Sequence, residues 1–158
     1  MKHKLIFILL TVTSIFITSC GENESNLVPI NTTINMNGFL DYYRGGKIEV
    51  MIYNNTSKKC SDFLNVDNPV QEKEEKMVTL NIPEGTDEIK LSEENVNIKP
   101  GVKTVYAVLK NKDGEKRGHE CQKAIKCASL GIEPLPDDAY HIEAGDRACV
   151  YLDIKLIP

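Results

Sequence analysis

The sequence predicts an all-β protein: a single β-sandwich of about seven short, mostly antiparallel strands, stapled by disulfides and carrying long loops. Apolar residues recur at every second position in several short segments, and glycine, proline and asparagine turn signals separate those segments. No stretch carries an apolar stripe at helical spacing over three turns. A chain of 158 residues is also the length of one domain, so a single sandwich accounts for it.

The first two predicted strands are Thr32–Leu40 and Lys47–Tyr53. In both segments apolar side chains occupy alternate positions, which places them on one face of a strand. The glycine pair in Arg44-Gly45-Gly46 is a turn signal between them. We therefore expect the two strands to form a hairpin with 41–46 as its loop.

The middle of the chain predicts shorter elements. Asn54–Asn68 is an irregular connection with one helical turn around Phe63 and Leu64. Met77–Ile82 alternates and is stopped by a proline and a glycine, so it is predicted to be a strand. Glu88–Leu91 is predicted to be a short strand, and Val96–Ile98 leads into a tight turn at the following Pro-Gly pair.

The last third of the chain contains the clearest strand, Lys103–Lys110. Apolar residues on both of its faces indicate a central position in a sheet. Lys116–Lys126 is predicted to be the neighbouring antiparallel strand. Ala128–Ala144 contains two prolines and is predicted to be a long loop. The final strand is Ala148–Ile157, whose inward residues are expected to be Ala148, Val150, Leu152, Ile154 and Leu156.

The five cysteines divide into one near the N-terminus and four in the predicted domain. An even number of cysteines in an exported chain indicates two disulfides, and four cysteines allow three pairings. We favour Cys60–Cys121 with Cys127–Cys149, because the last strand places Cys149 on the face opposite its core residues. The competing arrangement closes Cys121–Cys127 and leaves Cys60–Cys149. A zinc site is the other interpretation, but the cysteines lack the close C-x2-C spacing.

The first nineteen residues have the pattern of an export signal. Lys2 and Lys4 precede the apolar run Leu5–Ile17, which is long enough for a signal-peptide core and too short for a membrane-spanning helix. Ile17-Thr18-Ser19-Cys20 then resembles the lipobox of bacterial lipoproteins. The resemblance implies cleavage after residue 19 and lipid attachment at Cys20. It also implies that a residue other than aspartate at the next position, Gly21, directs the protein to the outer membrane.

These boundaries predict three parts: a lipoprotein signal peptide at 1–19, a lipidated tether at 20–31 and the sandwich at 32–158. Within the sandwich, Pro100-Gly101, Tyr106-Ala107-Val108 and the turn at Asn111–Gly114 resemble transthyretin-like and carboxypeptidase-regulatory-like domains. Those families are mostly non-catalytic modules, so the resemblance implies binding rather than catalysis.

No motif in the sequence predicts catalysis, a cofactor or a metal. His119 and His141 have no nucleophile motif beside them, and the carboxylates lie in lysine-mixed runs or turns. Asn111–Glu115 has oxygen ligands at alternate positions, but a hairpin turn explains it better than a calcium loop. The formal net charge of −4 excludes a broad basic face for nucleic acid.

We expect a non-catalytic binding or scaffold module that is held on the outer membrane by lipid on Cys20 and contacts another envelope protein. Tyr42, Tyr43 and Arg44 are the candidate interface, as exposed aromatics beside arginine suit a contact site; alternatively, one tyrosine packs inward. The alternative function is inhibition of a hydrolase such as lysozyme or a protease, with Ala128–Ala144 as the inserted loop. An enzyme is the third and least supported class.

Overall fold

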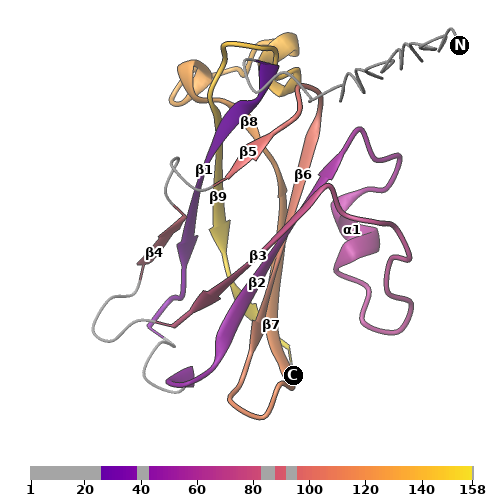
Figure 1. Cartoon of the computed structure of the whole chain (residues 1–158), viewed down its shortest axis with the longest axis vertical. Helices are drawn as coiled ribbons and strands as arrows, with labels where there is room; N and C mark the ends of the chain where they lie inside the picture. Colours follow the sequence, from indigo (N-terminus) through magenta and orange to yellow (C-terminus); the bar gives the residue numbers. More distant parts are fainter. Residues whose placement is uncertain (1–25, 39–42, 83–87, 92–95, 158) are drawn as a thin grey trace, which may run out of the picture.

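The computed structural model describes residues 26–38, 43–82, 88–91 and 96–157, which form two β-sheets packed face to face (Figure 1). Among these residues, seven strands have four or more residues and three have only two. The main core lies between the sheets and consists of apolar side chains from both. The protein is therefore an all-β sandwich, as the alternating sequence pattern predicts.

The first sheet is organised around β1 (Val28–Asn35). On one side β1 pairs antiparallel with β4 (Glu88–Leu91), and on the other it pairs parallel with β9 (Ala148–Asp153). β5 (Asn97–Ile98) pairs with the first residues of β1, and β8 (Ile125–Lys126) pairs with the first residues of β9. β1, the first strand of the described chain, and β9, its last long strand, therefore lie side by side (Figure 1).

The second sheet is antiparallel throughout, in the order β10 (Lys155–Leu156), β7 (Lys116–Lys123), β6 (Lys103–Lys110), β2 (Lys47–Asn54) and β3 (Lys76–Asn81). Seven of the eight residues of β6 are buried, and strands lie on both sides of it. This confirms the central position that its two apolar faces predict.

The predicted hairpin between the first two strands is wrong. β1 and β2 belong to opposite sheets, so the segment between them connects the sheets instead of turning back within one. Both strands have the expected buried face, with Ile34 on β1 and Ile48 on β2 fully buried. Alternation identifies the face that a strand buries but not its neighbour, and the Gly-Gly turn signal fits either connection.

The domain also begins earlier than predicted. β1 starts at Val28 rather than Thr32, and Val28 and Ile30 are fully buried in the main core. Pro29 and Asn31 are the intervening outward positions, and their polar, proline-containing sequence gave this segment the appearance of a linker. Residues 28–31 therefore belong to the sandwich and not to the tether.

Two predicted strands each divide between the sheets. Lys116–Lys126 divides at Ala124 into β7 and β8, and Ala148–Ile157 divides at Ile154 into β9 and β10. Both crossing residues are fully buried. At Ile154 the alternation of β9 continues into the crossing and conceals it, and at Ala124 no turn signal marks the change of sheet. Beyond the second crossing, Leu156 is 42% exposed, which contradicts the prediction that it faces the core.

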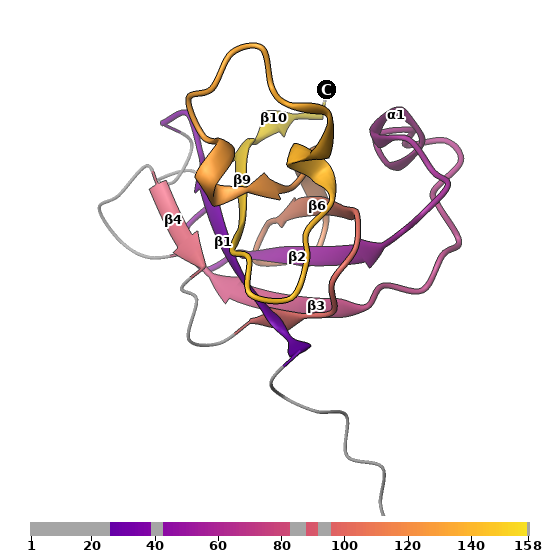
Figure 2. The same cartoon turned by 90° about the horizontal axis from the view of Figure 1, so that it is seen from above.

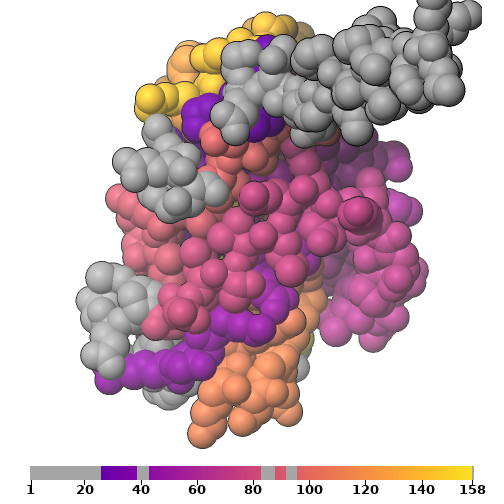
Figure 3. Space-filling view, viewed as in Figure 1, coloured from indigo at the N-terminus to yellow at the C-terminus, as the bar shows by residue number. Residues whose placement is uncertain are grey.

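A second apolar cluster covers the outer face of the second sheet. The short helix α1 (Cys60–Phe63) confirms the predicted helical turn and places the Phe63 ring over Tyr53 and Tyr106, at centroid distances of 4.7 and 5.7 Å. The Cys60–Cys121 disulfide fastens this helix to β7. In the space-filling view the segment around α1 forms a bulge on the right of the molecule (Figure 3).

Candidate functional site

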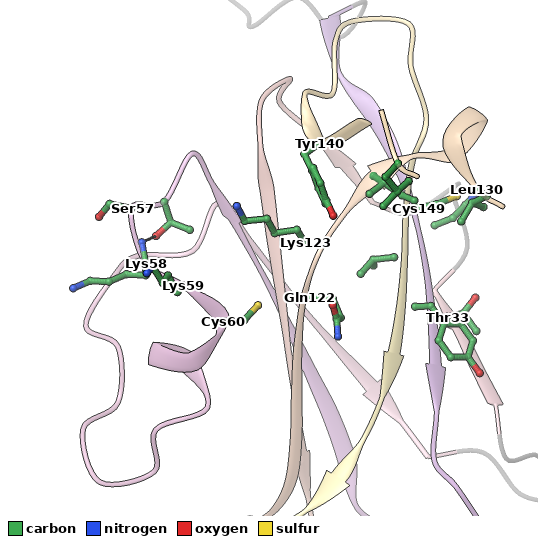
Figure 4. A pocket seen from close by; sticks show the side chains of 16 residues that line it. Thr33, Ser57, Lys58, Lys59, Cys60, Gln122, Lys123, Leu130, Tyr140 and Cys149 are labelled. Carbon is green, nitrogen blue, oxygen red and sulfur yellow. Dashed lines mark hydrogen bonds between the residues drawn. The ribbon is translucent and has the colours of Figure 1, made fainter. Parts of the chain in front are cut away.

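A groove of about 800 Å³ opens on the surface of the described part of the chain. One wall is the segment 56–60, which leads into α1. The opposite wall is the loop that follows β8, represented by Leu130, Leu135 and Tyr140. Between them lie β7, β8 and β9, with Gln122, Lys123 and Cys149 labelled in Figure 4. Figure 2 shows α1 and this loop on the same side of the molecule.

The groove lies where the two sheets have incomplete edges. β8 pairs with β9 only at Ala148 and Cys149, and β10 pairs with β7 only at Gly118 and His119. The chain crosses between the sheets at Ala124 and again at Ile154. The unpaired parts of β7 and β9 therefore lie between these two crossings. Edges of this kind present unpaired backbone groups and are sites where another strand can pair.

The open part of β7 is blocked by its own side chain. Glu120 is 3% exposed, and its Oε1 accepts a hydrogen bond of 2.9 Å from the backbone N–H of Cys121. The other carboxylate oxygen, Oε2, lies 3.1 Å from the Lys155 ammonium on β10. An inward-pointing charge is a known way to protect a strand edge from pairing. The β9 edge is therefore the more accessible of the two.

Both disulfides border the groove and confirm the favoured pairing. Cys60 and Cys121 have Cα atoms 5.3 Å apart, and Cys127 and Cys149 have Cα atoms 4.9 Å apart. The first bridge fixes the α1 wall to β7, and the second fixes the start of the opposite loop to β9. The walls are thus held in place before anything binds, which reduces the ordering cost of binding.

The lining of the groove combines apolar and cationic side chains. Leu130, Leu135 and Tyr151 are 59%, 39% and 52% exposed, values that are high for large apolar side chains. Lys58 and Lys59 line the α1 wall, are exposed, and form no ion pair within the described residues. The groove is thus basic and apolar, although the chain as a whole carries a net charge of −4.

The remaining cations near the groove have partners within the chain. The Lys123 ammonium lies 5.9 Å from the centre of the Tyr140 ring, a cation–π distance. Lys126 on β8 pairs with Asp138 and Asp146 at 3.4 and 3.7 Å, and these carboxylates hold its pKa above the ordinary value against the opposing effect of burial. Lys126 therefore ties the loop together, which leaves Lys58 and Lys59 as the lysines in the groove without a described partner.

His119 does not take part in a catalytic arrangement within the described structure. His119 Nδ1 lies 3.4 Å from the hydroxyl of Tyr106, which also accepts a 2.6 Å hydrogen bond from Lys116. Burial, and then Lys116, lower the pKa of His119, while Glu120 opposes them; burial raises the pKa of Tyr106 to about 12. Near neutral pH these effects favour a neutral imidazole and a protonated phenol, so this contact supplies no activated nucleophile.

The candidate interface from the sequence does not coincide with the groove. Tyr43 is half-buried and packs against the main core, as the alternative interpretation holds, and Arg44 is exposed. Tyr42 lies outside the described residues, and so does Cys20 with the entire lipobox. The sequence analysis identifies Cys60, Cys149 and the loop Ala128–Ala144 but not the groove that they border. Its lysines and Tyr151 were missed; their sequence signals are the paired lysines before Cys60 and the outward tyrosine of the last long strand.

The predicted hairpin turn after β6 explains the polar residues that resemble part of a calcium loop. The Asn111 side-chain oxygen accepts hydrogen bonds from the backbone N–H groups of Asp113 and Glu115, at 3.0 and 2.9 Å. Within the described residues, no group of three or more histidine, cysteine or acidic side chains is arranged to hold a metal ion. The side-chain oxygen of Asn111 thus serves to close a turn.

Comparisons with known proteins identify no relative of this chain. No protein-family profile, curated protein or solved structure matches the sequence or the fold. Among the described residues, no helix is both long enough and apolar enough to cross a bilayer. Function must therefore be argued from the groove and from the N-terminal sequence.

Proposed function

We propose that this protein is a lipid-anchored envelope lipoprotein of the outer membrane that acts as a non-catalytic binding module for another envelope protein. The observation that carries the proposal is the groove between two disulfide-fixed walls. It joins exposed leucines with Lys58 and Lys59, which have no ion-pair partner among the described residues. The N-terminal resemblance to a lipobox supplies the anchor, at Cys20. Two structural disulfides suit a chain that works in an oxidising compartment outside the cytoplasm.

Binding is favoured over catalysis by the chemistry of the groove. Its described lining includes hydroxyl groups such as Ser57 and Thr56, but no histidine. The Thr56 hydroxyl donates a hydrogen bond to Glu72, and this contact joins two parts of the same connecting segment. A hydrolytic nucleophile needs a base within hydrogen-bond reach and a group that orients that base. A rigid apolar and cationic groove is instead suited to recognition.

Inhibition of a hydrolase is a second candidate, favoured by the loop after β8. Two short 3₁₀ turns, Cys127–Ser129 and Asp137–Tyr140, bracket an exposed tip that carries Leu130 and Ile132. The Cys127–Cys149 disulfide fixes the base of this loop. A rigid, protruding apolar loop can enter an enzyme cleft at low entropic cost.

Site-specific photocrosslinking in the native cell tests the proposal. A benzoylphenylalanine is placed at Tyr151 in the groove, at Ile132 on the loop tip, or at Lys112 in the β6–β7 turn as a control. We expect one envelope protein to crosslink from position 151 and not from position 112. A hydrolase crosslinked only from position 132 would instead identify an inhibitor. Absence of any position-specific crosslink would refute both functions.

The membrane anchor is tested separately in the same cells. Metabolic labelling with an alkyne fatty acid should label the wild-type chain, and the Cys20→Ala variant should lose both the label and its membrane association. Unlabelled, soluble wild-type protein would contradict the anchor while leaving the groove experiment interpretable.

A further inference from the structure

We infer that the groove binds an extended acidic peptide segment, which adds as a strand to the open edge of β9 and directs its carboxylates to the lysines of the α1 wall. This inference rests on the proposed binding function and specifies the chemistry of the partner. Three independent features support it: the direction of unpaired backbone groups, the blocked edge of β7 and the charge of the groove.

The backbone of β9 offers hydrogen-bonding groups to the groove at Tyr151. The Ile154 N–H donates to the Asn35 carbonyl of β1, whereas the Arg147 carbonyl accepts from Cys127 on the opposite side of the strand. Backbone groups alternate in direction along a strand, so those of Tyr151 point away from β1, as those of Arg147 do. The pairing of β8 with β9 extends only as far as Cys149. No described strand or side chain pairs with the Tyr151 backbone groups beyond it.

The neighbouring edge directs an incoming strand toward β9. On β7 the Cys121 N–H is already bonded to Glu120, and that carboxylate would repel an acidic segment. Tyr151 on the outward face of β9 and Thr33 on the outward face of the adjacent β1 both line the groove. A partner strand alongside residues 150–153, the part of β9 beyond its pairing with β8, would be about 13 Å long at ~3.3 Å per residue, which is enough for four residues.

The positive charge of the groove favours acidic side chains in the partner strand. Lys58 and Lys59 are exposed on the α1 wall without a described ion-pair partner, and Lys123 lies nearby on β7. Leu130 and Leu135 supply the apolar surface opposite them. Since side chains alternate along a strand, a segment of alternating acidic and apolar residues would meet both surfaces.

A synthetic peptide tests the inference with the full acylated chain in detergent micelles. The probe is a fluorescein-labelled Glu-Val-Glu-Val-Glu-Val peptide, and its binding is followed by fluorescence anisotropy. Two comparison peptides isolate the features: one replaces glutamate with lysine, and one is N-methylated on the valines to remove strand hydrogen bonds. We expect saturable binding of the probe, at least tenfold weaker binding of both comparison peptides, and a loss of affinity with added salt.

Variants of the chain locate the site. The pair Lys58→Gln/Lys59→Gln should weaken probe binding about fivefold, while the charge-matched control Lys90→Gln/Lys112→Gln, outside the groove, should leave it unchanged. Tyr151→Pro removes the exposed N–H at a position where an edge strand tolerates proline and should weaken binding at least tenfold, whereas Tyr151→Ala keeps the N–H. Circular dichroism of each variant verifies folding, and if the proline variant is unfolded, the N-methylated peptide decides the strand contact.

Three results of the peptide titrations would overturn the inference. One is equal affinity for the acidic and basic peptides, another is equal loss in both lysine pairs, and the third is unchanged binding of the N-methylated peptide. Binding of myristate, with none of the peptide, would also overturn it and identify a lipid groove. A partner that crosslinks from position 151 but is not displaced by the probe would refute this inference alone and leave the binding function standing.

Discussion

The two disulfides should contribute unequally to stability, and the difference can be worked out from the loops that they close. The Cys60–Cys121 bridge spans 61 residues and the Cys127–Cys149 bridge spans 22. Restriction of the unfolded chain then gives about 4.3 kcal/mol for the first bridge and about 3.4 kcal/mol for the second. Removal of the first should therefore cost about 1 kcal/mol more than removal of the second.

Packing adds to this difference in the same direction. Cys60 begins the short helix that holds Phe63 over Tyr53 and Tyr106, and the Phe63 side chain is only 3% exposed. If the helix leaves the sheet, exposure of that ring costs a further 1.5–3 kcal/mol, roughly. The Cys127–Cys149 bridge holds a loop whose tip is already exposed, so its removal releases less apolar surface.

The assay is urea unfolding of the mature chain and of the variants Cys60→Ala/Cys121→Ala and Cys127→Ala/Cys149→Ala. Tyrosine fluorescence reports the transition, because the chain has no tryptophan. The free energy of unfolding should fall most for the first variant, and hydrogen exchange in residues 57–70 should rise only there. An equal or larger loss for the second variant would refute the reasoning from loop length and ring burial.

Three other predictions concern ionisable groups that are buried or half-buried. Lys103 is fully buried and pairs with Glu75 at 2.6 Å, so Lys103→Met should cost about 3 kcal/mol in urea unfolding, and Lys103→Met/Glu75→Leu should recover most of it. Because the pKa of His119 is lowered in the folded state, its contribution to the free energy of unfolding is complete above pH 6.5 and is lost as the pH falls through the folded pKa. His119→Gln should make the melting temperature less dependent on pH in that acidic range, as measured by thermal unfolding. The raised pKa of Tyr106, about 12, gives stability that is complete below pH 10 and lost between pH 10 and 12; a tyrosinate absorbance titration should lose its latest step in Tyr106→Phe.

Alternation in the sequence was enough to predict which faces of the strands are buried. β6 reads as central because both of its faces are apolar, and the outward position of Cys149 in β9 led to the correct disulfide pairing. Both properties are local, since they depend on the order of residues within one strand. The fold class follows from the same local information repeated along the chain.

Strand neighbours could not be predicted, because pairing is decided by tertiary packing. β1 has an alternating pattern that fits a partner on either sheet, and its parallel pairing with β9 joins segments more than 110 residues apart. The crossings at Ala124 and Ile154 are also invisible in sequence, since each is made by a single buried apolar residue with no glycine or proline beside it. The groove could not be predicted for the same reason, because Lys58 and Tyr151 are brought together only by the fold.

The position of the groove follows from how this sandwich ends its sheets. Because β8 and β10 have only two residues each, neither covers the strand beside it, and an open interval of β9 results. The walls on either side are loops with little regular structure, which the two disulfides attach to the flanking strands. Reduction of both bridges would release these walls from the strands. A groove with fixed walls therefore requires oxidised cysteines, and the binding that we propose would arise only in an oxidising compartment, as the proposed export of the chain implies.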